Sequence, residues 1–154
     1  MNNSKAEYII FSNSDIGVQR NFYTFVNKLI TKDKLKSFII NRRDNIPKFK
    51  FNQRLTDNDL DFIFFEKGIK HSGKDCFIIS REILMEINMS LMFTGYPPWG
   101  NTLYKLLKKI NPRTFIFKDE YLTFHLGKDN TWTKDNKNPL LLKNMEISKT
   151  VLTW

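Results

Sequence analysis

The sequence predicts one α/β domain spanning residues 1–154, with three layers and a mixed, largely parallel sheet. Three observations predict this class. Short apolar runs typical of strands alternate with segments whose apolar residues recur at helical spacing. The order strand–helix–strand occurs near the N-terminus and again over residues 76–117. A chain of 154 residues, 41% hydrophobic and 27% charged, is long enough to bury one core.

The N-terminal part is expected to contain two strands separated by a helix. Residues 7–12 and 37–41 are short runs rich in strand-forming residues. The helix is expected to begin after Ser14 or Asp15, since either side chain can accept a hydrogen bond from the first turn. Apolar residues at helical spacing over residues 22–30 form its buried face.

The central part adds two strands and a helix. Residues 60–65 and 76–80 are apolar runs that we interpret as strands. Ser80 is placed to cap a helix that follows the second of these strands. Two prolines and two glycines over residues 94–101 then predict a rigid loop.

The C-terminal part is expected to supply a helix and an antiparallel hairpin. A helix begins at residue 101 or 102 and ends at residue 110, because Asn-Pro follows it. Residues 113–117 and 121–126 are interpreted as the two strands of the hairpin. The last strand is expected over residues 149–154.

Positive charge is concentrated in one stretch. The formal net charge is +9, and residues 28–54 contain nine basic and two acidic residues, a net charge of +7. A concentrated positive field implies an anionic partner. Residues 48–51 alternate Lys and Phe, so an extended chain presents both rings on one face for stacking on bases, unless the rings are buried in an edge strand. The candidate nucleic-acid or anion-binding residues are Arg42, Arg43, Lys48, Phe49, Lys50 and Phe51, with Lys105, Lys108 and Lys109 as a second patch.

Several classes of protein are disfavoured. The single cysteine, Cys76, lies in an apolar run and is expected to be a buried thiol, with no disulfide and no cysteine-based zinc site. The dense acidic group at residues 57–66 lacks the Glu-x-Lys pattern of many metal-dependent nucleases, so no metal site and no cofactor are predicted. No apolar stretch of 18 residues and no secretory leader occurs, so we expect a cytoplasmic protein without a membrane partner.

Two histidines are candidates for acid–base chemistry. His71 lies in a basic, turn-like segment, where an exposed side chain is the simpler expectation. His125 ends an alternating run and shares its polar face with Tyr121 and Thr123. A general base on that face and an ordinary surface histidine are both compatible with the sequence. Neither histidine lies in the His-x-Thr/Ser pattern of paired-histidine phosphoesterases.

One segment resembles a known family. Over residues 96–121 the order is Pro-Pro-Trp-Gly-Asn, a leucine-rich helix, a strand and Lys-Asp-Glu-Tyr, which is similar to sialyltransferase-like glycosyltransferases. The strand ends at residues 10–14 and 38–42 are also similar to those that hold a cytidine nucleotide in such enzymes. The resemblance implies that Asn13, Ser14 and Asn41 contact the nucleotide and that His125 is the base. The sequence departs from the family because the expected Ser/Thr-Thr-Gly turn is Pro-Trp-Gly and the chain is short.

Three functions therefore stay open. The first is a basic nucleic-acid-binding protein, and its size, basicity and composition are those of an accessory factor of a virus or mobile element. The second is a sialyltransferase-like glycosyltransferase that uses a cytidine nucleotide sugar. The third is an inhibitor or adaptor that docks on an acidic protein partner. Whether the chain is an enzyme, and its oligomeric state, are not predicted.

Overall fold

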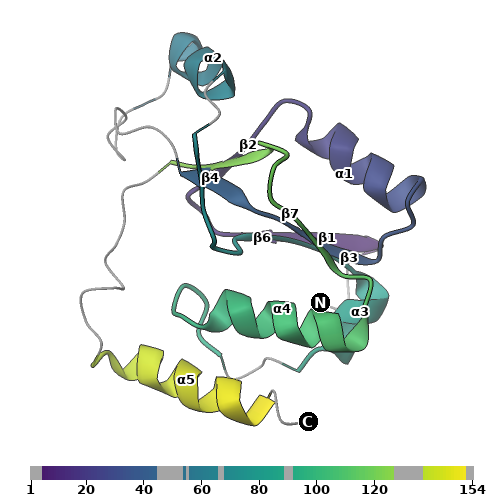
Figure 1. Cartoon of the computed structure of the whole chain (residues 1–154), viewed down its shortest axis with the longest axis vertical. Helices are drawn as coiled ribbons and strands as arrows, with labels where there is room; N and C mark the ends of the chain where they lie inside the picture. The colour runs from purple at the N-terminus through teal and green to yellow at the C-terminus, as the bar shows by residue number, and fades with distance from the viewer. Residues whose placement is uncertain are drawn as a thin grey trace.

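The computed structural model describes residues 5–44, 54, 56–65, 68–88, 92–126 and 137–151. Its helices and strands form a mixed α/β structure with two four-stranded sheets (Figure 1). The first sheet has the order β1-β6-β3-β7, and the second has the order β2-β8-β4-β5. The elements are β1 (Tyr8–Ser12), β2 (Ile16–Val18), α1 (Phe22–Thr31), β3 (Ser37–Ile40), β4 (Arg42–Asp44), α2 (Asp57–Phe65), β5 (Ile69–Lys70), β6 (Cys76–Ser80), α3 (Arg81–Glu86), α4 (Trp99–Ile110), β7 (Phe115–Phe117), β8 (Thr123–His125) and α5 (Pro139–Val151).

Each sheet is mixed, as predicted, but neither is largely parallel. In the first sheet β3 and β7 run parallel, whereas β6 pairs antiparallel with both β1 and β3. In the second sheet β4 and β8 run parallel, whereas the pairs β2–β8 and β4–β5 are antiparallel. The α/β class is therefore confirmed, and the expectation of a largely parallel sheet is wrong.

Three strands of the first sheet continue into strands of the second. β1 is followed by β2, β3 by β4, and β7 by β8, with only short connections between them. Asn41, between β3 and β4, donates its backbone N–H to the carbonyl of Phe117 at 2.9 Å, which holds the connection against β7. The two sheets therefore meet along one line, at which several strand ends lie together. We call this line the sheet junction.

The predicted C-terminal hairpin does not form. Residues 113–117 and 121–126 do contain strands, but β7 pairs with β3 in the first sheet and β8 pairs with β2 and β4 in the second. Because the chain passes from one sheet to the other between these strands, it makes no hairpin turn there. Tyr121, with a φ of 52°, lies in this connection.

The secondary structure of three further segments differs from the prediction. Residues 60–65 belong to α2 instead of a strand, because Thr56 and Asp59 cap the start of that helix reciprocally. No helix begins after Asp15, since the next residues form β2 and α1 starts only at Phe22. Residues 149–151 belong to α5, and the rest of the predicted last strand lies outside the described residues.

The helix predicted to begin at residue 101 or 102 is present and begins two or three residues earlier, at Trp99. The helix after β6 is also present, and the Ser80 hydroxyl caps it by accepting a hydrogen bond from the N–H of Ile83 at 3.4 Å. This helix, α3, is only six residues long.

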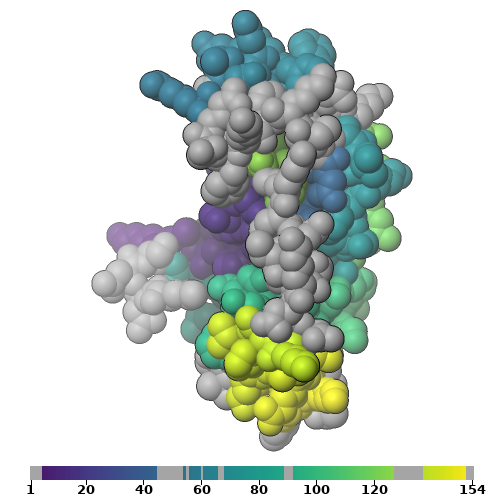
Figure 2. Space-filling model, turned by 90° about the vertical axis from the view of Figure 1, so that its left-hand side faces the viewer, coloured from purple at the N-terminus to yellow at the C-terminus, as the bar shows by residue number. Residues whose placement is uncertain are grey.

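Helices cover both faces of the first sheet. On one face, α1 packs against Phe38, Cys76 and Ile78 of the central strands. On the other face, α3 and α4 pack against Ile39 and Phe77. Alternate residues of β3 and β6 thus point into two cores, as the pleat of a strand requires. The predicted three layers describe this sheet and not the structure as a whole, since α2 and α5 lie at opposite ends of the molecule (Figure 2).

Gly17 in β2 is a position where a side chain would disturb the second sheet. A Cβ at this residue would lie 2.5 Å from the Cζ atom of Phe124, the residue of β8 that pairs with Gly17. We expect Gly17→Ala to lower the free energy of unfolding by about 1–3 kcal/mol, as overpacking does, measured by chemical denaturation. Phe124→Leu on the same background should recover part of the loss, because it removes the obstructing ring. Full additivity of the two substitutions would contradict this explanation.

Candidate functional site

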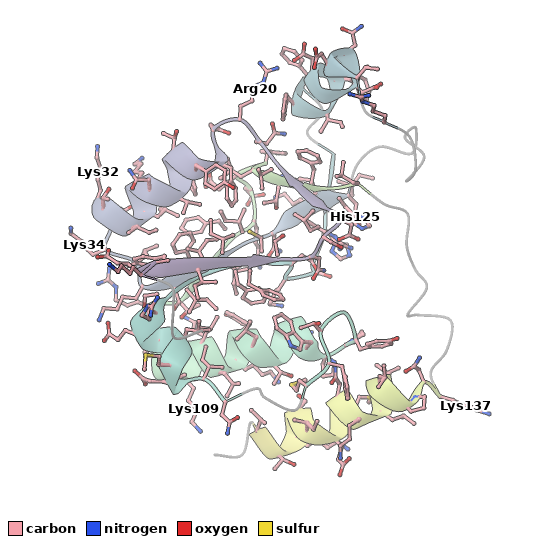
Figure 3. All side chains as sticks on the ribbon, turned by 180° about the vertical axis from the view of Figure 1, so that it is seen from behind. Arg20, Lys32, Lys34, Lys109, His125 and Lys137 are labelled. Carbon is pink, nitrogen blue, oxygen red and sulfur yellow. The ribbon has the colours of Figure 1, made fainter. Side chains whose placement is uncertain are left out.

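Eight polar and charged side chains gather where the two sheets meet. They come from the β1–β2 turn, from β4 and the residue before it, from the segment leading into β6, and from the end of β8. Figure 3 labels His125 beside these strand ends. We call this set the junction cluster, and its members are Asn13, Asp15, Asn41, Arg42, Asp44, His71, Asp75 and His125.

His125 and Asp15 form the shortest charged contact in the cluster. The Nε2–H of His125 donates to Asp15 Oδ2 at 2.8 Å, and the two side chains are only 6% and 17% exposed. Local pairing fixes this contact, since His125 is the register partner of Ile16 and the N–H of Leu126 donates to the Asp15 carbonyl at 2.8 Å. A carboxylate accepts only, so in neutral His125 the proton lies on Nε2 and the lone pair on Nδ1. Nδ1 faces Asp44 Oδ1 at 3.9 Å.

Arg42 joins the carboxylates of two different segments. Its Nε donates to Asp44 Oδ1 at 3.1 Å, and its Nη1 lies 3.3 Å from Asp75 Oδ2. The other oxygen of Asp75 accepts a hydrogen bond from Asn13 Nδ2 at 3.1 Å. The Arg42 side chain is 13% exposed and engaged on two sides, so it serves as a bridge within the cluster.

His71 is partly exposed at the cluster, and its neutral ring has a defined tautomer. The N–H of Gly73 donates to His71 Nδ1 at 2.8 Å, so the proton of the neutral ring is on Nε2. Nε2 lies 3.5 Å from Arg42 Nη2 and 3.7 Å from Asp44 Oδ2. Burial, followed by the nearby Arg42 charge, lowers the pKa of His71. A neutral ring that donates from Nε2 is therefore the form present at neutral pH.

Negative charge exceeds positive charge inside the cluster. Burial raises the pKa of Asp75, although Arg42 opposes that shift. Without the histidines, the three carboxylates and one guanidinium give a formal charge of −2. Among the described residues, no hydrogen-bond partner is found for two buried oxygens, Asp15 Oδ1 and Asn41 Oδ1. The cluster therefore favours ligand groups that donate hydrogen bonds over anionic groups. Within the part of the chain that the structure describes, no group of three or more His, Cys, Asp or Glu residues is arranged to hold a metal ion.

The predicted nucleotide-binding and catalytic residues are partly brought together. Asn13, Asn41 and His125 all belong to the junction cluster, and Asn41 Nδ2 donates to the His71 carbonyl at 3.0 Å. Ser14 is exposed in the turn beside them. The expectation of a surface position for His125 is wrong, because the second sheet buries its ring.

The predicted basic patch is divided by the structure. Arg42 lies in the cluster, whereas Arg43 points to the other face of β4, 4% exposed, with its guanidinium 3.7 Å from the centroid of the Tyr121 ring. Neither guanidinium forms an exposed basic surface, since carboxylates or an aromatic ring cover each one. Lys48, Phe49, Lys50 and Phe51 lie outside the described residues. Lys105, Lys108 and Lys109 are exposed on α4.

Sequence reasoning missed three members of the cluster. It predicts Asp15 only as a helix cap and assigns no site role to Asp44 or Asp75, whereas His71 is named only as a candidate for acid–base chemistry. Asp44 is the last residue of β4, and Asp75 directly precedes β6. Position at a strand end was the signal that could have indicated these two residues. That signal is weak, because the pairing of β4 with β8 and of β1 with β6 had to be known first. The prediction of a buried Cys76 is confirmed, and burial raises the pKa of its thiol to about 12.

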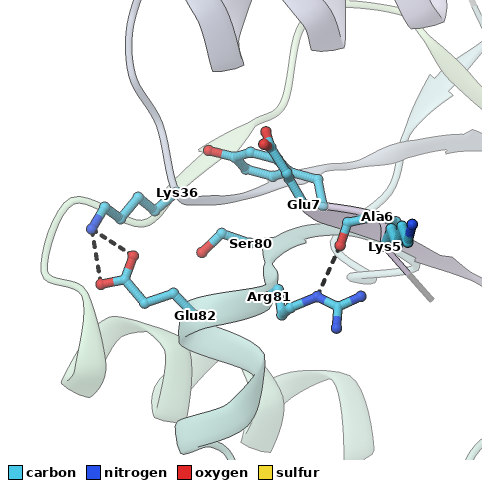
Figure 4. Close-up of a pocket in the computed structure, with 8 residues that line it drawn as sticks. Lys5, Ala6, Glu7, Lys36, Ser80, Arg81 and Glu82 are labelled. Atoms are coloured by element: carbon cyan, nitrogen blue, oxygen red, sulfur yellow. Dashed lines mark hydrogen bonds and ion pairs between the residues drawn. The ribbon is translucent and has the colours of Figure 1, made fainter. Parts of the chain in front are cut away.

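A depression lies at the opposite end of β6 from the junction cluster (Figure 4). It has a volume of about 360 Å³, and its walls include Lys36, Arg81 and Glu82. Lys36 Nζ contacts both carboxylate oxygens of Glu82, at 2.8 and 3.0 Å, and Arg81 Nε donates to the Ala6 carbonyl at 3.0 Å. Lys36 and Glu82 are thus engaged with each other, and we assign no ligand to this depression.

Comparison with protein families, with curated proteins and with solved structures gave no match to this chain. No helix among the described residues is both long enough and apolar enough to cross a membrane.

Proposed function

We propose that this chain is an acid–base enzyme that activates a hydroxyl group, with His125 as the general base. The observation that carries the proposal is the 2.8 Å hydrogen bond between His125 Nε2 and Asp15 Oδ2, in a nearly buried setting. A carboxylate that holds one ring nitrogen of a histidine orients the ring and stabilises the imidazolium formed when the other nitrogen takes a proton.

The donor that we propose is a cytidine nucleotide sugar, and the reaction is glycosyl transfer. The acceptor hydroxyl gives its proton to His125 Nδ1 while its oxygen forms a bond to the anomeric carbon. The bond between that carbon and the phosphate oxygen breaks, and the phosphate leaves with the electron pair. Asp15 and Asp44 both face the resulting imidazolium, which supports this direction of proton transfer.

The placement of asparagines and lysines supports a nucleotide-linked donor. Asn13 and Asn41 lie in the cluster with His125 and supply amide groups suited to a nucleoside. The phosphate would be repelled by the carboxylates, but Lys74 follows the His71 loop and donates to Asn101 Oδ1 at 2.6 Å, in the first turn of α4. Burial, followed by the charge of Lys118, lowers the pKa of Lys74, so the field of a second cation acts on this lysine.

Turnover of nucleotide sugars tests the proposal directly. The protein is incubated with cytidine, uridine and guanosine nucleotide sugars, each with a mixture of hydroxyl acceptors, and release of the nucleotide is measured. We expect release from the cytidine donor above the rate without protein. No release from any of the donors would contradict the proposed function.

A second candidate function, nucleic-acid binding, is favoured by one surface. Lys105, Lys108 and Lys109 are exposed on α4, at spacings of three and four residues that place them on neighbouring positions of the helix. Lys108 Nζ lies 5.8 Å from the centroid of the Phe115 ring, and that ring is half-exposed on the edge strand β7. Cations beside an exposed ring are the elements of single-strand binding.

Replacing Lys105, Lys108 and Lys109 together with Gln should weaken binding of single-stranded RNA or DNA. The slope of log K against log salt should fall in magnitude by about 2, because about 0.7 counterion is released per phosphate contact on a single strand. Fluorescence anisotropy over a salt series measures both quantities. The matched control replaces Lys28, Lys32 and Lys34, three exposed lysines at the end of α1, with Gln. Equal losses in both triple variants would show an effect of net charge alone, and retention on an acidic protein but not on nucleic acid would favour the adaptor function.

A further inference from the structure

One loop connects the two sheets beside the sheet junction, and the ring of His71 fixes its backbone. The loop covers residues 71–75 and leads from β5 in the second sheet to β6 in the first. We call it the junction loop. The N–H of Gly73 donates to His71 Nδ1 at 2.8 Å, and Asn41 Nδ2 donates to the His71 carbonyl at 3.0 Å. The imidazole is therefore a hydrogen-bond acceptor on which the shape of the loop depends.

The close approach of the Gly73 amide to this ring requires a glycine. A Cβ atom at residue 73 would lie 2.6 Å from both Nδ1 and Cε1 of His71, and 2.8 Å from Asp75 Oδ2. A larger residue would therefore force the ring and the backbone apart.

The same loop contacts the start of α4. Lys74 Nζ donates to Asn101 Oδ1 at 2.6 Å, in the first turn of that helix. A Cβ on Gly100 would lie 2.8 Å from the Lys74 carbonyl oxygen, so the loop backbone packs directly on α4. A change in the loop backbone thus reaches Asn41 on one side and Asn101 on the other.

A proton on His71 Nδ1 is incompatible with this arrangement. The neutral ring has a lone pair on Nδ1, whereas the imidazolium carries a proton on both nitrogens and accepts no hydrogen bond. Protonation therefore directs two donors at each other, Nδ1–H and the N–H of Gly73, and the 2.8 Å contact is lost.

Charged groups from three other segments act on the ring. They are Arg42 and Asp44 of β4, Asp75 before β6 and His125 of β8. The two carboxylates favour the imidazolium, and the two basic groups oppose it. Lys70, the preceding residue in β5, is paired with Asp119. Burial acts more strongly than any one of these charges, and it lowers the pKa of His71.

The direction of the pH dependence follows from this lowered pKa. The closed loop binds the proton more weakly than an exposed histidine does, for which the ordinary value is 6.5. The stability of the closed loop is therefore fully present above pH 6.5 and is lost progressively as the pH falls below that value.

We propose that the junction loop is a pH-sensitive switch, closed while His71 is neutral and opened when His71 Nδ1 takes up a proton. The imidazolium then pairs with Asp44, whose Oδ2 lies 3.7 Å from Nε2 and whose side chain is 43% exposed. Opening withdraws the His71 carbonyl from Asn41 and Lys74 from Asn101. Only one consequence, weaker binding of the donor in mild acid, rests on the proposed function, which places Asn41 and Lys74 beside that donor.

An NMR titration of the full chain from about pH 8 to about pH 5 tests the switch. The Cε1 chemical shift of His71 reports protonation of the ring, and the amide shift of Gly73 reports the loop. We expect both to change with one common midpoint below 6.5, while the amides of β6 keep their shifts. Protection of the Gly73 amide from hydrogen exchange, corrected for the intrinsic pH dependence, should fall by about tenfold over this range.

Two variants with opposite effects connect the titration to the ring. His71→Asn offers an amide oxygen to the Gly73 N–H in place of Nδ1 and takes up no proton, so the Gly73 titration should vanish although His125 is still present. Gly73→Ala should open the loop at neutral pH and raise the midpoint of His71 towards 6.5, because the ring becomes exposed. Ser72→Ala, at an exposed position of the same loop, is the matched control and should keep the native titration.

Each outcome decides for or against the switch. A His71 midpoint at or above 6.5, a Gly73 amide that keeps its shift while His71 titrates, or a Gly73 titration that survives His71→Asn would overturn the inference. If His71→Asn does not fold, Gly73→Ala decides, and an unchanged midpoint of His71 in that variant overturns it. A titrating loop in a protein that releases no nucleotide leaves the switch standing and removes the proposed function. Nucleotide release by a protein whose loop does not titrate does the reverse.

Discussion

His125→Ala is expected to lower the rate of transfer from the cytidine donor by about 100- to 10,000-fold, the range that a positioned general base contributes. The loss should fall on kcat, because the ring acts on the proton that moves in the reaction and holds no large part of the substrate. The measurement is initial-rate release of nucleotide at saturating donor. Circular dichroism and the thermal midpoint establish that the variant is folded.

Asp15→Asn is the companion variant that separates a base from a merely structural ring. The amide of Asn can donate to His125 Nε2, which moves the ring proton to Nδ1 and removes the lone pair that accepts the substrate proton. We therefore expect a loss of kcat of similar size while the shape of the side chain is kept. Glu82→Gln serves as the control, with an unchanged rate. Rates equal to that of the native protein in both His125→Ala and Asp15→Asn would remove His125 from the mechanism.

Apolar runs and helix caps in the sequence correctly predicted several strands and helices. β1, β3 and β6 are apolar runs of strand-forming residues, and the structure places them together in the first sheet. Ser80 and the leucine-rich pattern before Asn111 likewise predicted α3 and α4. The prediction of a strand over residues 60–65 was wrong because an apolar run of six residues fits a strand or a buried helix equally well. The Thr56–Asp59 cap decided that choice, and it lies before the run.

The pairing of strands could not be predicted in the same way. Nothing in the residues of β7 and β8 shows that the chain changes sheets between them, because register depends on partners far along the sequence. The junction cluster depends on that change of sheets, which brings His125 beside Asp44 and, through β2, beside Asp15. His125, Asn13 and Asn41 could therefore be named as candidates, but the carboxylates that give His125 its properties could not.

The fold changes how two of the predicted basic residues can act. The stretch over residues 28–54 carries most of the formal charge, yet the folded chain pairs Arg42 with two carboxylates and packs Arg43 against Tyr121. A cation that is already paired contributes little to the field felt by a distant polyanion. Exposed lysines such as those on α4 contribute more, which is why they carry the nucleic-acid alternative.

Phe77→Ala is expected to lower the free energy of unfolding by about 3–5 kcal/mol, because removal of a fully buried ring loses its transfer free energy and leaves a cavity. Phe77 lies in β6 between β1 and β3, has no exposed surface, and meets the Trp99 ring edge-on at a centroid distance of 5.8 Å. It therefore holds the start of α4, and with it Asn101 and Lys74, against the first sheet.

Urea denaturation followed by tryptophan fluorescence measures the change in stability. Phe115→Ala is the matched control, since this ring lies half-exposed on an edge strand and should cost less than about 1 kcal/mol. Because a typical domain is stable by only about 5–15 kcal/mol, Phe77→Ala could unfold the chain, and Phe77→Leu then supplies an intermediate value. Equal losses at Phe77 and Phe115 would mean that packing between α4 and the first sheet does not hold the site in place.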